Sequence, residues 1–275
     1  MPIIKRQTLN AGSTGTLLRT WRQRRRLSQL DLSLETEISQ RHLSFIESGR
    51  ATPSREMVLR LAEGLALPLR ECNALLLAAG YAPHYVERSL DAVELASARR
   101  VVQLVLDAHE PYPALAVDRH WTLLMANRAL APLLEGVDAT LLQPPVNVLR
   151  VSLHPQGMAP RIANFSQWRA HVLHRLRRQI EQSADAVLVE LHRELEAYPV
   201  PENLRPRDLA EEPSGSSIAV PMALIVGDRL LSFLSTTTVF GTPTDISLSE
   251  LAIESFFAAD ADTAAYCRSW QAQQP

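Results

Sequence analysis

The segment SQLDLSLETEISQRHLSFIESGRATP, residues 28–53, decides the fold of the first part of this chain. It is expected to form two short helices with a tight turn between them. Ser28 and Ser39 are N-cap residues, whose hydroxyls accept hydrogen bonds from the free N–H groups of the helix that follows. Leu43 and Ile46, at positions i and i+3, anchor the second helix on one face. A short helix held by two apolar residues, with long donors in its first turn, has the shape that enters a DNA major groove.

This segment resembles the helix-turn-helix of the Cro/C1 repressor class, also called the XRE family. The resemblance covers about residues 12–70 and implies an all-α, five-helix, lambda-repressor-like DNA-binding domain at residues 13–80, after a flexible arm at residues 1–12. Glu37 stands in the turn where the family usually has Gly. Either Glu37 is left-handed, at a cost of about 1 kcal/mol, or the turn has a slightly different shape. The matching residues are Arg22, Leu27, Ser28, Gln29, Leu32, Ile38, Ser39, Leu43, Ile46, Glu47, Gly49, Arg50, Pro53 and Leu61.

The other helices of this domain follow from apolar spacing and from their end signals. One is expected over Thr14–Arg26, one begins near Ser54, and one covers Arg70–Ala79, where Gly80 ends it.

Base contacts are expected from the exposed start of the second helix of the motif. Glutamine suits adenine and arginine suits guanine, each pairing being worth roughly 1–3 kcal/mol of discrimination. Phe45 either contacts a thymine methyl or packs against a neighbouring helix. The predicted base-contacting residues are Gln40, Arg41, Ser44 and Phe45.

Phosphate contacts are expected from three residues around the motif. Gln29 matches the phosphate-contacting glutamine of the family, and Arg50 follows the recognition helix directly. Arg22 lies in a basic cluster with residues 24–26. That cluster either contacts phosphates or forms a solvated basic face at a helix C-terminus, where cations favour the helix dipole.

Composition favours a two-domain globular protein. The 275 residues are 46% hydrophobic and 21% charged, which is enough for two separate cores. The sequence contains no run of 18 apolar residues and no secretory signal pattern. The two cysteines, Cys72 and Cys267, lie far apart, as expected in a reducing cytoplasm. Residues 1–80 carry a net charge of +5 and the remainder −7, so only the first domain is expected to meet nucleic acid.

A connector helix is expected between the two domains, at residues 81–108. The stretch from Pro83 to Asp107 is helical by pattern and carries apolar residues along much of its length. It is either a dimerisation element or a helix that packs on the second domain.

The second part of the chain mixes hairpins and helices. Ala114–Val117 and Trp121–Met125 form a predicted hairpin with its turn at residues 118–120, and Gly227-Asp228 is a strong turn signal between two later strands. Residues 147–158 are either helical or extended. The other predicted elements are helices at Asn127–Leu134, Ile162–Glu181, Ala184–Glu196 and Ser247–Phe257, and strands at Ser217–Val226 and Arg229–Thr238.

Three segments carry a second resemblance: RVSLHPQGMAPRIANFSQWRAHVLHRLRRQI (150–180), ELEAYP (194–199) and LSFLSTTTVFGTPTDISLSELAIESFFAAD (231–260). They are similar to the MmyB-type ligand-binding domain that follows helix-turn-helix modules. The match covers about residues 110–265. It implies an α+β, PAS-like domain at residues 109–270, in which a small antiparallel sheet and flanking helices surround an apolar pocket.

The expected ligand site combines one helix with aromatic residues of the later strands. These residues either line a pocket or fill an ordinary core. If there is a pocket, Arg175 or Arg178 meets an acidic head group, and a hydrophobic or amphipathic ligand such as a fatty acid is expected. His171 and His174 have metal-ligand spacing but no nearby carboxylate or cysteine, so no metal is expected. The candidate residues are Trp168, His171, His174, Arg175, Arg178, Phe233, Leu234, Phe240 and Phe256.

No catalytic fingerprint occurs in the sequence, so an enzyme is not expected. The sequence predicts a cytoplasmic transcription regulator that binds a double-stranded DNA operator as a homodimer and responds to a small-molecule effector. No cofactor is expected besides a bound fatty acid or other apolar ligand, and no membrane partner. The alternative is a DNA-binding protein whose second domain serves dimerisation or binds a protein partner, without a ligand.

Overall fold

A computed structural model describes residues 13–201 and 220–273 of the chain, which divides into two compact units. The first unit comprises the chain up to Arg88 together with Pro243–Ser249, and the second comprises Ser89–Thr242 and the chain from Glu250 onward. The predicted arm at residues 1–12 lies outside the described residues. Within those residues, no helix combines the length and the apolar character needed to span a membrane.

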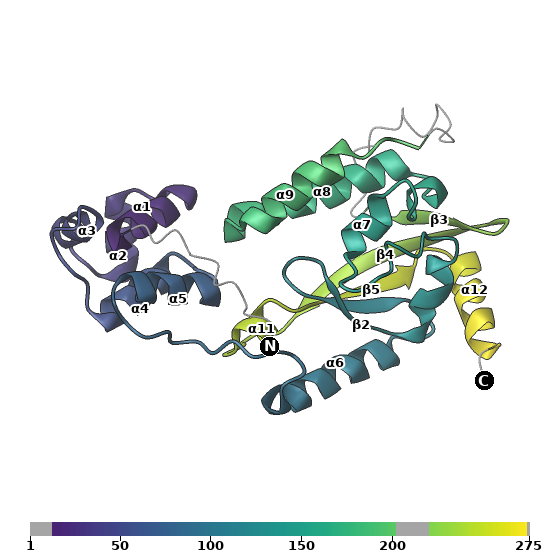
Figure 1. Ribbon diagram of the computed structural model, residues 1–275, viewed down its shortest axis with the longest axis horizontal. Coiled ribbons are helices and arrows are strands. Elements are labelled where there is room, and N and C mark those ends of the chain that lie inside the picture. The colour runs from purple at the N-terminus through teal and green to yellow at the C-terminus, as the bar shows by residue number, and fades with distance from the viewer. Residues whose placement is uncertain (1–12, 202–219, 274–275) are drawn as a thin grey trace. The chain divides into compact units, whose positions relative to one another are not determined.

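The first unit contains the five predicted helices (Figure 1). Serine hydroxyls cap four of them: Ser13 accepts from Thr16 N–H, Ser28 accepts from Asp31 N–H in a full capping box, and Ser39 and Ser54 cap the next two helices. Leucine and isoleucine side chains from all five helices fill one core. The helices are α1 (Thr14–Arg24), α2 (Gln29–Thr36), α3 (Gln40–Glu47), α4 (Arg55–Gly64) and α5 (Leu69–Ala78).

Glu37 ends α2 in the left-handed conformation, with φ of 53°. Its backbone N–H donates to the carbonyl of Ser33, which satisfies one of the free carbonyls at the helix end. Ile38 is buried directly after this turn. The non-glycine turn therefore keeps the geometry of the motif.

The second unit is built on a five-stranded antiparallel sheet with the order β2-β1-β5-β4-β3. Its central strand comes last in the sequence, so the sheet closes only when the end of the chain inserts between the two hairpins. The strands are β1 (Ala114–Val117), β2 (Leu123–Ala126), β3 (Met222–Val226), β4 (Arg229–Val239) and β5 (Ala252–Ala258).

Helices cover both faces of this sheet. Figure 1 shows α6 (Ala96–Ala108) on one face and the pair α8 (Phe165–Ser183) and α9 (Ala186–Ala197) on the other. Buried residues of α6 pack against β1 and β5, whereas the larger core lies on the side of α8 and α9. The remaining elements are η1 (Val93–Leu95), η2 (Arg128–Leu134), α7 (Val148–Leu153), η3 (Ala159–Arg161), α11 (Ile246–Ser249) and α12 (Ala261–Ala272).

Two predicted elements differ in the structure. The predicted helix Ser247–Phe257 is wrong, because α11 ends at Ser249 and residues 252–258 form β5. Ile253, Glu254 and Ser255 are all buried, as expected of a central strand covered on both faces. The predicted connector helix is helical only from Val93, where η1 leads into α6, and the residues before η1 form no helix.

The fold class is confirmed: an all-α five-helix domain is followed by an α+β domain with an antiparallel sheet. The predicted strand from Ser217 is described only from Val220, and β3 begins at Met222.

Candidate functional site

The recognition helix α3 presents a polar face beside a buried one. Leu43 and Ile46 are 0% and 1% exposed and hold the helix against the core. Gln40 and Arg41 are exposed. The Arg41 guanidinium lies 5.5 Å from the centre of the Phe45 ring, a cation–π distance that orients both side chains. The four predicted base-contacting residues lie on this one short helix, with Ser44 and Phe45 half-buried.

A buried ion pair fixes α3 to α1. The Arg22 guanidinium donates to both oxygens of Glu47, with Nε–Oε1 of 2.6 Å and Nη2–Oε2 of 2.9 Å. Arg22 also donates to the carbonyl of Leu27, and Gln29 donates to Glu47 Oε2 at 2.9 Å. Burial alone would raise the pKa of Glu47, but the hydrogen bonds from Arg22 and Gln29 and the charge of Arg22 outweigh it, so this pKa is lowered.

The three predicted phosphate contacts therefore differ in their surroundings. Arg22 is only 8% exposed, and its guanidinium is held by Glu47 of α3. Gln29 is half-buried and shares Glu47 with Arg22. Arg50 is exposed and follows the left-handed Gly49 at the end of the recognition helix. The phosphate contacts of all three residues stay predictions.

The second unit contains a partly open apolar cavity of about 230 Å³ between the sheet and the helices of its larger core. Engineered cavities of about 150 Å³ with comparable walls bind benzene or xenon. Leucine, valine, methionine and aromatic side chains make up almost the whole wall. The lining residues are Leu115, Trp121, Leu123, Leu130, Leu133, Leu134, Leu142, Val146, Val148, Leu149, Val151, Ser152, Met158, Trp168, Val172, Arg175, Met222, Glu254 and Phe256.

The cavity has one charged end, formed by Arg175 of α8 and Glu254 of β5. Arg175 Nη1 and Nη2 donate to the two oxygens of Glu254 at 3.1 and 2.7 Å. Thr237 of β4 donates to Glu254 and accepts from Arg175. The Arg175 guanidinium also lies 4.9 Å from the ring centre of Trp121. The arginine at the cavity wall is therefore already neutralised by a carboxylate.

A second, more polar hollow of about 350 Å³ shares this end of the cavity. Trp121, Arg175 and Glu254 line both spaces and therefore form the partition between them. Arg178 and Gln179 of α8 line the polar hollow but not the apolar cavity. An apolar space and a polar space therefore meet at this partition.

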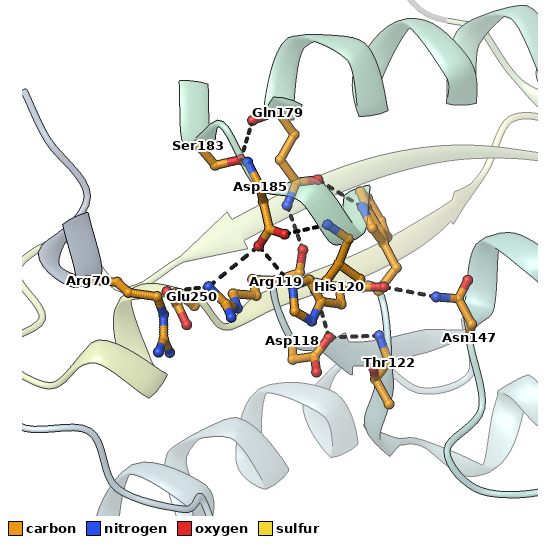
Figure 2. A network of polar contacts seen from close by, with 12 residues as sticks. Arg70, Asp118, Arg119, His120, Thr122, Asn147, Gln179, Ser183, Asp185 and Glu250 are labelled. Carbon is orange, nitrogen blue, oxygen red and sulfur yellow. Dashed lines mark hydrogen bonds and ion pairs between the residues drawn. The ribbon is translucent and has the colours of Figure 1, made fainter. Parts of the chain in front are cut away.

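A polar network holds the β1–β2 turn that carries Trp121 (Figure 2). His120 Nε2 and Asp185 Oδ2 are 2.8 Å apart, and Arg119 Nη1 lies 3.4 Å from the same oxygen. Gln179 donates to the carbonyl of Arg119 and accepts from the indole N–H of Trp121 at 2.8 Å. Trp121 is left-handed, with φ of 66°, a strained conformation for a bulky residue.

Asp185 is the carboxylate that His120 and Arg119 share in this network. The hydrogen bond with His120 is the largest influence on its pKa; burial opposes it and a hydrogen bond from Val187 N–H adds to it, so the pKa falls to about 2. Asp185 is also the N-cap of α9. One carboxylate thus ties the hairpin turn to the junction of α8 and α9.

The nine predicted ligand residues fall into three groups. Trp168, Arg175 and Phe256 line the cavity, and Arg178 lines the neighbouring hollow. Phe233 is fully buried in the core, while Phe240 packs with the α6 cluster on the other face of the sheet. The members that line neither space are His171, His174, Phe233, Leu234 and Phe240.

His171 supports the cavity wall from behind. Its ring stacks on Trp168 with a centroid distance of 5.6 Å and an angle of 28°. Burial, followed by the charge of Arg175, lowers the pKa of His171, which favours the neutral ring. His174 is exposed.

Most of the cavity wall was not predicted. It comes from the first hairpin, η2 and α7, whose leucines and valines read in sequence as ordinary core residues. Glu254 is the main omission. Its only sequence signal is a carboxylate inside the apolar run AIESFFA, which needs a partner when buried.

Comparison with protein families assigns both halves of the chain. The model described as "MmyB-like transcription regulator ligand binding domain" matches residues 98–269, and the model described as "Helix-turn-helix" matches residues 18–72. Both resemblances seen in the sequence are therefore confirmed. No match is found among curated proteins.

Proposed function

This chain belongs to the family of MmyB-like transcription regulator ligand binding domains and carries a helix-turn-helix domain before it; from that premise we propose that it reads a DNA operator as a homodimer and responds to a small hydrophobic or amphipathic effector. The chain is a DNA-binding transcription regulator with a ligand-binding domain. The operator contacts, the class of effector and the dimer are the proposal. The observation that carries the ligand part of the proposal is the apolar cavity with its single charged end.

The DNA half rests on α3. The exposed Gln40 and Arg41 stand beside a face that is locked by Leu43, Ile46 and the Arg22–Glu47 pair. Such a rigid helix can hold two bidentate donors against base edges. One module contacts one half-site, so a symmetric operator calls for two copies of the chain.

The variant Arg41→Ala tests the proposed base contact of α3. We expect operator affinity to fall by roughly 10- to 100-fold, since a bidentate base contact is worth about 1–3 kcal/mol, while affinity for random DNA falls much less. Gel shifts with a selected operator and a scrambled duplex measure both values. Arg60→Ala is the matched control, because it removes an exposed arginine from α4 of the same domain. Unchanged operator affinity in Arg41→Ala would refute the assignment.

The ligand half rests on the cavity. A domain that serves only dimerisation needs no internal space, and an unfilled apolar void weakens packing. The cavity and its polar neighbour together resemble the concave, mostly apolar sites that bind small molecules. A fatty acid fits the apolar walls, but its carboxylate would compete with Glu254 for Arg175 or turn to Arg178. Binding would shift the population between DNA-competent and DNA-incompetent states.

Native mass spectrometry of the full chain tests the ligand half directly. The probes are saturated fatty acids and the alcohols of equal chain length, added to protein that has been stripped of bound lipid. We expect a one-to-one adduct that Val172→Phe weakens at least tenfold by filling the cavity from α8. Val187→Phe makes the same change at an exposed position of α9 and is the control. No adduct with either probe series, or equal binding by both variants, would refute this half of the proposal.

A further inference from the structure

The helix α6 has two apolar faces, and the second unit uses only one of them. Val102 and Leu106 are fully buried and pack with Ala114 and Ile253 of the sheet. A second stripe points away from this core. It consists of Val101, Leu104, Val105 and Ala108, all exposed.

The stripe has the spacing of a helix–helix interface. Its members are at positions i, i+3, i+4 and i+7, which is the pattern of a helical contact face. Leu104 is 61% exposed, Val101 49% and Val105 38%. Single exposed apolar residues are ordinary, but three large ones on one face of a short helix point to a covered surface.

Two charges beside the stripe indicate the kind of surface that would fit it. Arg100 and Asp107 flank it on the same side, two turns apart, or about 10 Å along the helix axis. Arg99 is paired with Asp91, whereas no ion pair or hydrogen bond joins the Arg100 side chain to any residue within 13–201 and 220–273. Asp107 accepts a hydrogen bond from Gln103, one turn earlier on the same helix, at 2.7 Å.

We propose that α6 pairs with α6 of a second copy of this chain in antiparallel orientation, about a two-fold axis near Leu104. Arg100 and Asp107 lie on the same flank of the stripe. The same flank of two helices meets across an interface only when the helices are antiparallel. This orientation brings Arg100 beside Asp107 of the partner subunit, and the two-fold axis repeats the contact. The apolar stripe then meets itself, with Leu104 at the centre. A parallel pair would set each residue level with its own copy and would leave both charges without a partner.

This surface adds a dimer interface to the proposed function. Its role in bringing two DNA-binding domains to two half-sites rests on that proposed function. The helix has 13 residues, about 20 Å of length, and buries less than the roughly 800 Å² per partner of a standard interface. The dimer is therefore weak in free solution and becomes firm when both DNA-binding domains occupy one operator, because the second contact is then intramolecular.

Sedimentation velocity of the full chain over the micromolar range tests the pairing. We expect a concentration-dependent dimer whose dissociation constant rises at least tenfold in Leu104→Glu. Leu230→Glu is the matched control, since Leu230 is similarly exposed, at 57%, on β4, and it should leave the dimer unchanged. A wild-type chain that stays monomeric throughout, or equal disruption by both variants, would overturn the proposal.

Charge exchange tests the orientation. Arg100→Asp and Asp107→Arg each place like charges together and should weaken the dimer about tenfold, whereas the double variant restores opposite pairs and should return to wild-type affinity. Failure of the double variant to recover would overturn the antiparallel pairing. All variants should bind an isolated half-site as the wild type does. If no protein binds the half-site, the DNA-binding proposal fails while the dimer result stands separately.

Discussion

Replacing Glu47 by Gln isolates the ion pair that fixes the recognition helix. The side chains of Arg22 and Glu47 are 10% and 4% exposed, so water does little to compensate the loss. The carboxylate receives two bonds from Arg22 and one from Gln29. A glutamine keeps one acceptor oxygen but turns an NH₂ group toward donors, which leaves a guanidinium buried without a counter-charge.

The expected cost is about 3 kcal/mol of the free energy of unfolding of the first unit. Removing one partner of a buried ion pair costs roughly 3–5 kcal/mol, and the remaining neutral hydrogen bond keeps the loss at the lower end. The contribution of this ion pair to the free energy of unfolding depends on pH. The pKa of Glu47 is lowered in the folded state, so the contribution is complete above the ordinary glutamate value of 4.5 and is lost as pH falls through the folded-state pKa.

Hydrogen–deuterium exchange of the full chain measures this loss in place. Peptides from α1 to α5 should lose protection by roughly 100-fold at neutral pH, since about 1.4 kcal/mol corresponds to a factor of ten, whereas peptides from α8 should not change. The double variant Arg22→Met/Glu47→Met should lose less than the two single variants combined, because it leaves no unpaired charge. Less than a threefold change in Glu47→Gln would refute the reasoning.

Three further variants probe the close contacts of both units. Gly15→Ala should destabilise the first unit by about 2 kcal/mol, because an added Cβ would lie 2.5 Å from the carbonyl oxygen of Ile46; hydrogen exchange measures this, and Gly241→Ala, which meets nothing within 4 Å, is the control. Asp185→Asn should remove about 2 kcal/mol from the second unit at neutral pH, since the pKa is about 2 when folded and 3.8 ordinarily. Thermal unfolding should show that the wild type loses this stability as pH falls from 3.8 toward 2, and that the variant does not. Glu254→Gln frees the charge of Arg175, so the ratio of fatty-acid to fatty-alcohol affinity should rise at least about tenfold; an unchanged ratio in native mass spectrometry would mean that the head group does not reach the ion pair.

The first unit was predictable because its signals are local. N-cap serines, apolar spacing within one helix and a short turn are all read over a few residues. The left-handed conformation of Glu37 is one of the two alternatives that the sequence leaves open for this turn. The contact between Gly15 and the end of α3 was not predictable, because those segments lie far apart in sequence and the glycine is required only by their close approach.

The second unit was harder because its centre is non-local. The strand β5 pairs with β1 and β4, whose sequence positions are remote from each other, and its burial on both faces removes the alternation that identifies a strand. The sequence therefore predicts a helix at Ser247–Phe257, where the structure has α11 followed by β5. Most of the cavity wall could not be predicted either, because a leucine beside a cavity and a leucine in a filled core have the same sequence pattern.

The position of Glu254 gives the proposed regulation a physical route. A ligand at the charged end of the cavity meets a residue on the central strand β5. Glu250, four residues before Glu254, is the first residue of the second unit after the segment Pro243–Ser249 of the first unit. The chain also passes between the two units at residues 88–89 and 242–243. The first unit therefore includes a segment whose two ends continue into β4 and toward β5. Under the proposed regulation, a shift of Glu254 would act on a strand that follows directly on residues of the DNA-binding unit.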